Sequence, residues 1–144
     1  MGELPTLPSA HELADAMAQS AVVLPPKEKE EEKVNNIERS VNASYSDAPI
    51  LIEVAKCESS MKQFTKNGDI FRGEANDYDV GVMQINEFYH SDTAKRLGFN
   101  LHTLEGNIGY GRYLYEKYGT KPWSASEKCW GKFREMAQES KSKS

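Results

Sequence analysis

The sequence predicts a mainly α-helical (α+β) domain with one small β-hairpin. Amphipathic stretches with helix caps, such as ILIEVAKCESSM at 50–61, predict the helices, and a single turn-rich stretch at 67–86 is where a hairpin fits. A chain of 144 residues has the length of one domain and can bury a real core.

The first 33 residues differ in composition from the rest of the chain. The stretch PPKEKEEEK at 25–33 joins two prolines to a run of charges and has nothing apolar to bury, so we predict a linker there. Before it, SAHELADAMAQSAVV (9–23) has modest helical periodicity, which fits a loosely attached helix or a frayed tail. We therefore expect an N-terminal tail and charged linker at 1–33 and the folded domain at 34–144.

The first half of this domain carries two predicted helices and then the hairpin. VNNIERSVNASYSD (34–47) is a short helix candidate, and Pro49 suits the first turn of the helix at 50–61. In NGDIFRGEANDYDVGVMQIN (67–86), turn-forming residues separate the apolar runs Ile70–Phe71 and Val80–Ile85. Strand alternation in the second run would place Asp79, Gly81, Met83 and Ile85 on one side and Val80, Val82, Gln84 and Asn86 on the other.

Three helices are predicted after the hairpin, at 91–98, 103–118 and 122–139. The first has Ser91 or Asp92 as its N-terminal cap and Gly98 as its stop. In the second, Gly111 interrupts an apolar face at a cost of about 1 kcal/mol in helix propensity. We therefore expect another part of the chain to approach the Gly111 backbone closely.

Composition argues against several functional classes. The formal net charge is −4, so the chain lacks the basic field with which proteins gather nucleic acid, and no nucleic-acid partner is expected. No stretch approaches about 18 consecutive apolar residues, which predicts no transmembrane segment. The N-terminal residues carry acids where a signal peptide carries Lys or Arg, so the protein is either cytoplasmic or has lost a signal ahead of Met1.

The two cysteines, Cys57 and Cys129, lack the spacing of a zinc site. One lies beside Glu58 and the other in the C-terminal helical segment. They form either one disulfide across the fold, in an oxidising compartment, or two buried free thiols. His90 and His102 have no partner at i, i+4 and no cysteine nearby, so neither a metal nor a cofactor is expected.

Glu58 is the unusual residue of ILIEVAKCESSM. At about 100° per residue, the apolar side chains of this stretch fill one arc of a helix, and Glu58 falls inside that arc between Leu51 and Val54. Desolvation there disfavours the carboxylate and raises the pKa of the side chain. A carboxylic acid that stays protonated can donate a proton to a glycosidic oxygen. The alternative is a glutamate at the end of a helix that swings out to solvent.

Three motifs, AKCESSMKQF, DVGVMQIN and GNIGYGRYLYEKYG, follow one another in this order. The first two resemble the lysozyme superfamily, in which an Ala-x-x-Glu-Ser helix end precedes a Gly-apolar-Met/Leu-Gln-Ile strand. The third resembles the Asn-Ile-x-x-Gly-x-x-Tyr-Leu helix of the soluble lytic transglycosylase branch. The resemblance covers roughly residues 45–131 and implies a lysozyme-like domain that cuts the β-1,4 bond between N-acetylmuramic acid and N-acetylglucosamine in peptidoglycan.

The resemblance assigns roles to individual residues. Glu58 matches the family's general acid, and Ser59, its neighbour in the motif, is expected to bind substrate. Gln84 and Asn107 match cleft positions that hold the substrate or the shape of the site. We expect Asn86, which like Gln84 interrupts the apolar run of DVGVMQIN, to bind substrate as well. An amide such as that of Gln84 can both donate to and accept from an N-acetyl group.

Two departures from the family bear on the chemistry. WSASEKCW stands where lytic transglycosylases have Ala-Tyr-Asn-x-Gly, so the tyrosine over the acid is missing and Trp123, Ser124 or Ser126 is a candidate for part of its role. Animal-type lysozymes read Asp-Tyr-Gly-Ile-Leu-Gln-Ile-Asn, close to DVGVMQIN, which aligns Asp79 with their second carboxylate. The alternative for Asp79 is to cap backbone N–H groups at the hairpin turn.

The resemblance thus implies a peptidoglycan-degrading muramidase with Glu58 as general acid/base. It acts either as a lytic transglycosylase that leaves a 1,6-anhydro product or as a lysozyme-like hydrolase in which Asp79 takes part. The alternative is a catalytically weak or inactive lysozyme-like module that binds glycan or serves in an assembly. The substrate implies an extracytoplasmic location, at the cell envelope or secreted, and we expect a monomer whose partner is the glycan strand.

Aromatic side chains are numerous for a small domain. Most are expected in the core, while exposed ones can stack on sugar rings. The candidates are Tyr78, Phe88, Tyr89, Tyr110, Tyr113, Trp123 and Trp130.

Overall fold

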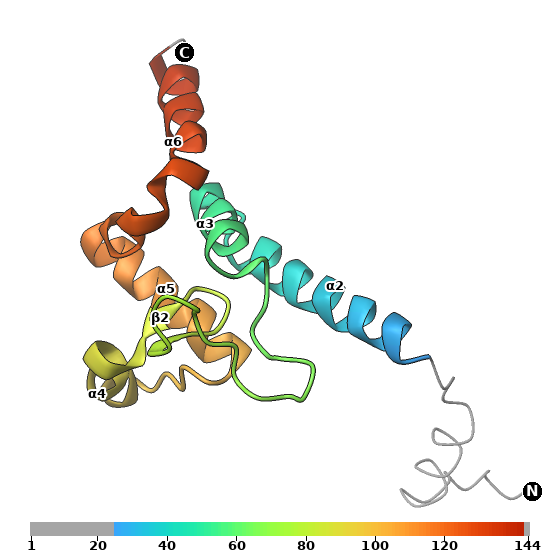
Figure 1. Cartoon of the computed structure of the whole chain (residues 1–144). Helices are drawn as coiled ribbons and strands as arrows, with labels where there is room; N and C mark the ends of the chain where they lie inside the picture. Colours follow the sequence, from blue (N-terminus) through green and yellow to red (C-terminus); the bar gives the residue numbers. More distant parts are fainter. Residues whose placement is uncertain (1–24, 143–144) are drawn as a thin grey trace, which may run out of the picture.

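The computed structural model describes residues 25–142, and these form a mainly helical domain with one two-stranded antiparallel sheet, as predicted. In chain order the elements are α2 (Pro26–Ser44), α3 (Pro49–Ser59), β1 (Asp79–Val80), β2 (Ile85–Asn86), α4 (Glu87–Leu97), α5 (Leu104–Tyr118), the 3₁₀ helix η1 (Lys121–Ser126) and α6 (Glu127–Ser142). Figure 1 shows α3 beside the start of α6, with the small sheet and α4 toward the other end of the body. The helix predicted at 9–23 lies outside the described residues.

Helix α2 changes the prediction for 25–33. These residues are the start of a helix rather than a linker, because Pro26 suits the first helical position and Glu28 lies in the first turn, where an acid interacts well with the helix dipole. Their described side chains are exposed, as expected of a charged run. The second half of α2 reaches the core, through Ile37, Val41 and the residue that follows the helix, Tyr45. The boundary predicted between 33 and 34 thus falls inside a helix.

Helix α3 begins at Pro49, as predicted, and ends where Ser60 adopts a left-handed conformation with φ of 53°. Its buried residues are Leu51, Val54, Ala55 and Ser59. This is the apolar arc seen in the sequence, and it faces the core. Glu58 falls within this arc, between Leu51 and Val54, but it is only half-buried because it lies in the last turn of the helix.

The hairpin pairs differently from the prediction. Its strands are two residues long, with Asp79 opposite Asn86 and Val80 opposite Ile85. The run predicted as one strand is therefore the whole hairpin, and Gly81 and Gln84, with φ of 74° and 51°, turn the chain between its two halves. Strict alternation is lost, because the consecutive residues from Val80 to Met83 are all buried. The run Ile70–Phe71 is not a strand: Ile70 forms an isolated bridge with Phe64, and the backbone of Phe71 bonds to that of Gln63 and Gly81.

Helix α4 starts at Glu87 rather than at Ser91 or Asp92. The reason is Asn86, whose Oδ1 accepts a hydrogen bond of 3.2 Å from the backbone N–H of Tyr89 and so caps the helix. Gly98 ends α4 in a left-handed conformation, as predicted.

Helix α5 lies at the centre of the domain and matches the predicted segment. Thr103 caps it, because its Oγ1 accepts a hydrogen bond of 3.0 Å from the backbone N–H of Gly106. A Cβ atom on Gly111 would lie 2.7 Å from the hydroxyl oxygen of Tyr45 and 3.1 Å from Cγ of Met83. The close approach predicted at Gly111 is therefore present, and it brings α2 and the hairpin turn onto α5.

The C-terminal segment contains two helices instead of the single predicted one. The chain forms η1, kinks at Trp123, where φ is −110°, and continues as α6. Helix α6 packs against α3. Cys57 of α3 and Cys129 of α6 form a disulfide with their Cα atoms 5.9 Å apart, which is the first of the two alternatives for these cysteines. Cys129 is exposed and Cys57 is partly exposed, so the bridge lies near the surface.

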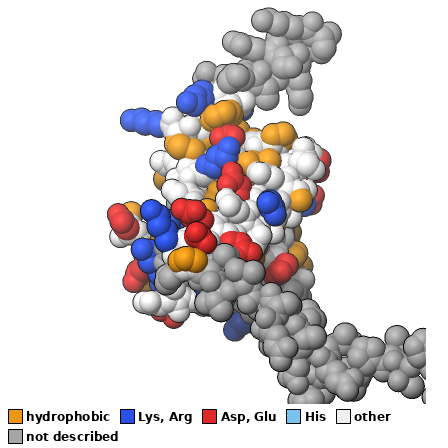
Figure 2. Space-filling view, turned by 90° about the vertical axis from the view of Figure 1, so that its right-hand side faces the viewer, with side chains coloured by type: hydrophobic (Ala, Val, Ile, Leu, Met, Phe, Trp, Pro, Cys, Tyr) orange, Lys and Arg blue, Asp and Glu red, His pale blue; other side chains and the backbone are white. Residues whose placement is uncertain are grey.

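The core lies where α2, α3, α5 and α6 meet the hairpin turn. Its largest fully buried apolar side chains are Trp130, Tyr45, Tyr110, Leu51 and Met83. On the face shown in Figure 2, acidic and basic side chains are interspersed. None of the helices described in residues 25–142 is long and apolar enough to cross a membrane.

Candidate active site

Glu58 lies in the last turn of α3, at the end against which η1 and α6 pack. Burial raises the pKa of its carboxyl group, a hydrogen bond from Ser126 lowers it, and the negative charge of Asp79 raises it. The net effect is an increase in pKa, the direction expected from the position of Glu58 in the apolar arc. Glu58 is therefore well suited to hold a proton at the surface of the core.

The hydroxyl of Ser126 connects Glu58 to the C-terminal helices. Ser126 Oγ lies 2.7 Å from Oε1 of Glu58 and 3.1 Å from the carbonyl oxygen of Trp123, and it accepts a hydrogen bond of 2.9 Å from Nε1 of Trp130. Of the three residues that were candidates for the missing tyrosine's role, Ser126 is thus the one that contacts Glu58. Ser124 is exposed, and Trp123 is buried.

Asp79 is in β1 and carries the second carboxyl group of the site. Burial raises its pKa, and a hydrogen bond from Asn86 lowers it, with a net increase. Because Oδ1 of Asn86 accepts from the backbone of Tyr89, its amide nitrogen is the group that can donate to Asp79. Asn86, predicted to bind substrate, thus has two structural roles: it caps α4 and it donates a hydrogen bond to Asp79. The charge of Asp79 acts on Glu58, so the fold brings the two carboxyl groups to one site.

Ser59 is buried, with 3% of its surface exposed. Its hydroxyl lies 2.7 Å from the carbonyl oxygen of Val82 and 3.0 Å from that of Ala55, and it accepts a hydrogen bond of 3.2 Å from the backbone N–H of Lys62. Ser59 therefore holds α3 to the hairpin turn and does not face a substrate.

Asn107 is fully buried in α5 and binds the same turn. Its Nδ2 donates to the carbonyl oxygens of Val80 at 3.0 Å and Leu101 at 2.9 Å, and its Oδ1 accepts from the backbone N–H of Met83 at 2.9 Å. Of the two roles that the resemblance allows for Asn107, holding the shape of the site fits this position.

Two further side chains, those of Gln63 and Trp123, hold the hairpin turn in place. The sequence did not indicate this role for either of them. Gln63 is fully buried, and its Oε1 accepts from the backbone N–H of Val82 at 2.8 Å. Trp123 Nε1 donates to the carbonyl oxygen of Met83 at 2.8 Å. The only sequence signal for Gln63 is an amide between the apolar residues Met61 and Phe64. Buried backbone groups need partners, and these side chains supply them where no strand does.

Gln84 follows the fixed turn and is half-buried. Its Nε2 donates to the carbonyl oxygen of Gly81 at 3.0 Å, so the side chain closes its own turn. A Cβ atom on Gly73 would lie 2.7 Å from Oε1 of Gln84, which places this amide against the segment before Asp79. Gln84 is therefore near the second carboxyl group, since a Cβ atom on Gly73 would also lie 3.5 Å from Cβ of Asp79.

Three exposed aromatic rings form a cluster, and one of them, Tyr78, directly precedes Asp79 in the chain. The ring centroids of Tyr78 and Phe88 are 5.4 Å apart, and those of Phe88 and Tyr89 are 5.2 Å apart. The exposed fractions of Tyr78, Phe88 and Tyr89 are 50%, 67% and 74%. Of the other aromatic candidates, Tyr110, Trp123 and Trp130 are buried. The sequence did not distinguish this exposed cluster from the core.

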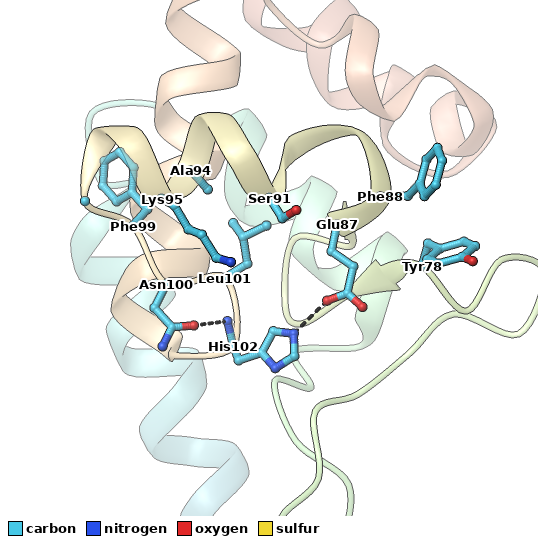
Figure 3. Close-up of a pocket in the computed structure, with 11 residues that line it drawn as sticks. Tyr78, Glu87, Phe88, Ser91, Ala94, Lys95, Phe99, Asn100, Leu101 and His102 are labelled. Carbon is cyan, nitrogen blue, oxygen red and sulfur yellow. Dashed lines mark hydrogen bonds and ion pairs between the residues drawn. The ribbon is translucent and has the colours of Figure 1, made fainter.

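A pocket of about 660 Å³ adjoins the aromatic cluster. Figure 3 shows Tyr78 and Phe88 at one end of it and Phe99 and Asn100 at the other. Glu87 lies between them, with its carboxylate 2.6 Å from Nε2 of His102. Burial raises the pKa of Glu87, but hydrogen bonds and electrostatic attraction from His102 and Arg72 lower it, and the net effect is a decrease.

A second pocket of about 670 Å³ lies between α2 and the loop after α3, lined by Val34, Ile37, Met61, Phe64 and Phe71 among others. Neither pocket is lined by Glu58 or Asp79. The candidate site is therefore defined by the surroundings of the two carboxyl groups and not by a closed hollow. The described residues contain no group of three or more His, Cys, Asp or Glu side chains that could hold a metal ion.

No family model matches this chain, and neither the curated proteins nor the solved structures contain a significant match. The chemistry of the site therefore has to be inferred from its own groups. It offers one half-buried carboxyl group with a raised pKa, a hydroxyl bonded to it, and a second carboxyl group within electrostatic reach. Such a pair can carry general acid/base catalysis.

Proposed function

We propose that this protein is a muramidase that cleaves the β-1,4 bond between N-acetylmuramic acid and N-acetylglucosamine in peptidoglycan. The observation that carries the proposal is the environment of Glu58, whose carboxyl group is half-buried, has a raised pKa and interacts with a second carboxyl group, Asp79. Glycosidases with two carboxyl groups need an acid that is still protonated and a second group of different environment.

In the proposed reaction, Glu58 donates its proton to the glycosidic oxygen as the bond to C1 of the muramic acid breaks. In a hydrolase, Asp79 stabilises or traps the positive charge that develops at C1 until water attacks. In a transglycosylase, the C6 hydroxyl of the same sugar attacks, and the Glu58 carboxylate removes its proton. The acidic residue at position 79 is compatible with both routes, and the protein itself needs no cofactor in either.

Three further observations support a glycan as substrate. Tyr78 of the exposed aromatic cluster directly precedes Asp79 in the chain, and aromatic faces stack on sugar rings. The motifs around Glu58, Gln84 and Asn107 occur in the order of the lysozyme superfamily. A disulfide at the site fits an oxidising compartment, as does a substrate outside the cytoplasm.

The test is clearing of purified cell walls by wild type and Glu58→Gln. We expect a loss of at least about 100-fold in the variant, the smaller end of what general acid/base catalysis contributes. Glu53→Gln, on the same helix, is the matched control and should retain activity. Mass spectrometry of the products then separates the two routes, since 1,6-anhydro ends indicate transglycosylation and reducing ends indicate hydrolysis. A wild-type protein that binds walls and releases no fragments would instead be a glycan-binding module.

A further inference from the structure

The hydroxyl of Ser126 has more potential partners than one fixed orientation can serve. A hydroxyl carries one hydrogen atom and two lone pairs. The Nε1–H of Trp130 can only donate, so at 2.9 Å it occupies one lone pair of Ser126. The carbonyl oxygen of Trp123, at 3.1 Å, can only accept. Glu58 Oε1, at 2.7 Å, accepts when the carboxyl group is ionised and can donate when it is protonated.

With the proton of a neutral Glu58 on Oε1 and directed at Ser126, two arrangements of the hydroxyl satisfy all three partners. When Glu58 is a carboxylate, the Ser126 hydrogen points to Oε1 of Glu58. When Glu58 is a carboxylic acid, the Ser126 hydrogen points to the carbonyl oxygen of Trp123, and the second lone pair accepts the acid proton. In both arrangements Trp130 donates to the same hydroxyl, so Glu58 is never without a hydrogen-bond partner.

We propose that Ser126 is a positioning residue whose hydroxyl reverses its hydrogen-bond direction each time Glu58 gains or loses a proton. The proposal rests on the proposed function, because it concerns how Glu58 acts first as acid and then as base. When the proton of Glu58 turns from Ser126 to the glycosidic oxygen and is transferred to it, the Ser126 hydrogen turns from Trp123 to the carboxylate that is left. When Glu58 takes a proton from water or from the sugar hydroxyl, the hydrogen turns back.

The frame around Ser126 is rigid enough to keep this geometry. The side chain of Trp130 is fully buried, and Trp123 is 2% exposed and anchored to Met83 through its indole nitrogen. The disulfide joins Cys57, next to Glu58 in the chain, to Cys129, next to Trp130. Only the hydroxyl hydrogen has to move, so the exchange costs no rearrangement of the core.

Apart from the Ser126 hydroxyl, few groups affect the pKa of Glu58. Asp79 of β1 is the charged group that acts on it. The charged side chains nearest to Ser126 in the chain are Glu127 and Lys128 of α6, and with Lys121 of η1 they are exposed to solvent. Removal of the hydroxyl should therefore change the titration of Glu58 directly.

The experiment measures the pKa of Glu58 by ¹³C NMR of its carboxyl carbon, assigned by the signal that disappears in Glu58→Gln. In Ser126→Ala we expect this pKa to rise, because the carboxylate loses a donor while the acid loses only an acceptor. Ser126→Thr keeps a hydroxyl and should return the pKa toward the wild-type value. Ser124→Ala, two residues away and exposed, is the matched control and should leave it unchanged.

Activity gives a second readout. Wall clearing by Ser126→Ala should fall about 10- to 100-fold, as expected for the loss of a hydrogen bond to a charged group. The basic limb of the pH–activity profile of this variant should also move to higher pH. Trp130→Phe should move the pKa in the same direction by a smaller amount, because the hydroxyl is then less polarised.

A Glu58 pKa that is the same in Ser126→Ala and Ser124→Ala would overturn the coupling, even if the wild type clears walls. A pKa that rises in Ser126→Ala and returns in Ser126→Thr would support the coupling, even if no variant clears walls and the proposed function fails.

Discussion

Ser126 and Glu58 lie 2.7 Å apart, hydroxyl oxygen to carboxylate oxygen, although 68 residues separate them in the chain. The contact exists because α6 and η1 pack on the C-terminal end of α3. The disulfide between Cys57 and Cys129 joins the same two helices at residues adjacent to Glu58 and Trp130. The bridge, the buried indole and the hydroxyl thus form one support for a single carboxyl group.

Removal of the disulfide should weaken both the fold and this support. The bridge closes a loop of 72 residues, so we expect Cys57→Ser/Cys129→Ser to lower the free energy of unfolding by about 2–5 kcal/mol. Urea denaturation of wild type and double variant measures the difference. Dithiothreitol should destabilise the wild type and leave the double variant unaffected. An unfolding midpoint that does not respond to the reductant in the wild type would contradict this expectation.

Asp79→Asn should lower the pKa of Glu58, because it removes the negative charge that raises it. The substitution retains the size of the side chain. The ¹³C titration of Glu58 measures the shift, and Asp77→Asn, an exposed change two residues away, is the control. If Asp79 takes part in catalysis, wall clearing should also fall by about 100-fold or more. Full activity in Asp79→Asn would remove Asp79 from the mechanism.

Phe88→Ala tests the aromatic cluster as a sugar-binding surface. Phe88 is 67% exposed and contacts both Tyr78 and Tyr89, so its removal should disturb the surface without opening the core. We expect wall binding to weaken about 3- to 10-fold, the range of a single aromatic contact. Phe64→Ala is a matched control, since Phe64 is a partly exposed ring that lines the other pocket. Equal losses in the two variants would contradict a specific role for the cluster.

Elements with local signals could be predicted from the sequence almost to the residue. Pro49 marks the start of α3, Thr103 caps α5, and Gly98 ends α4. In each case the residue type itself favours the local geometry, whatever surrounds it. The position of Glu58 on the buried face of α3 could be predicted for the same reason, because helical periodicity is local.

The hairpin and the surroundings of Glu58 depend on distant residues. The run after Asp79 is apolar enough for a strand, yet it turns at Gly81, where Gln63 and Asn107 bind its backbone from other elements. The sequence around Asn86 fits a strand residue and a helix cap equally well. The hydrogen bond that its side chain accepts from the backbone N–H of Tyr89 shows that it caps α4. The contact of Ser126 with Glu58 produces no periodic pattern in the sequence, since it depends on how α6 packs against α3.

Asn107→Ala should be among the most destabilising single changes in the domain. Asn107 is fully buried, and its loss would leave the N–H of Met83 and the carbonyl oxygens of Val80 and Leu101 without this partner. Each buried group left unpaired costs about 1–3 kcal/mol. Chemical denaturation measures the change, and Asn35→Ala, an exposed asparagine of α2, should cause little. A loss no greater than in the control would contradict the role of Asn107 in fixing the turn.

Glu58→Gln should make the folded protein more stable at neutral pH while it removes activity. Because the pKa of Glu58 is raised in the folded state, that state binds the proton more tightly than the unfolded chain does. As pH rises from the unfolded pKa of about 4.3 through the higher folded pKa, the wild type loses stability that it keeps at lower pH. Glutamine has no such titration, so the variant lacks this loss.

The measurement is the free energy of unfolding of wild type and Glu58→Gln, in urea, from about pH 3 to pH 8, a range that starts below the unfolded pKa. Groups common to both proteins cancel in the difference. We expect the advantage of the variant to be smallest at the acidic end, to grow between the two pKa values of Glu58, and to stay constant above them. Glu53→Gln controls for removal of a carboxylate from α3. A difference that does not vary with pH, or that favours the wild type as pH rises, would show that the fold does not hold Glu58 in its protonated form.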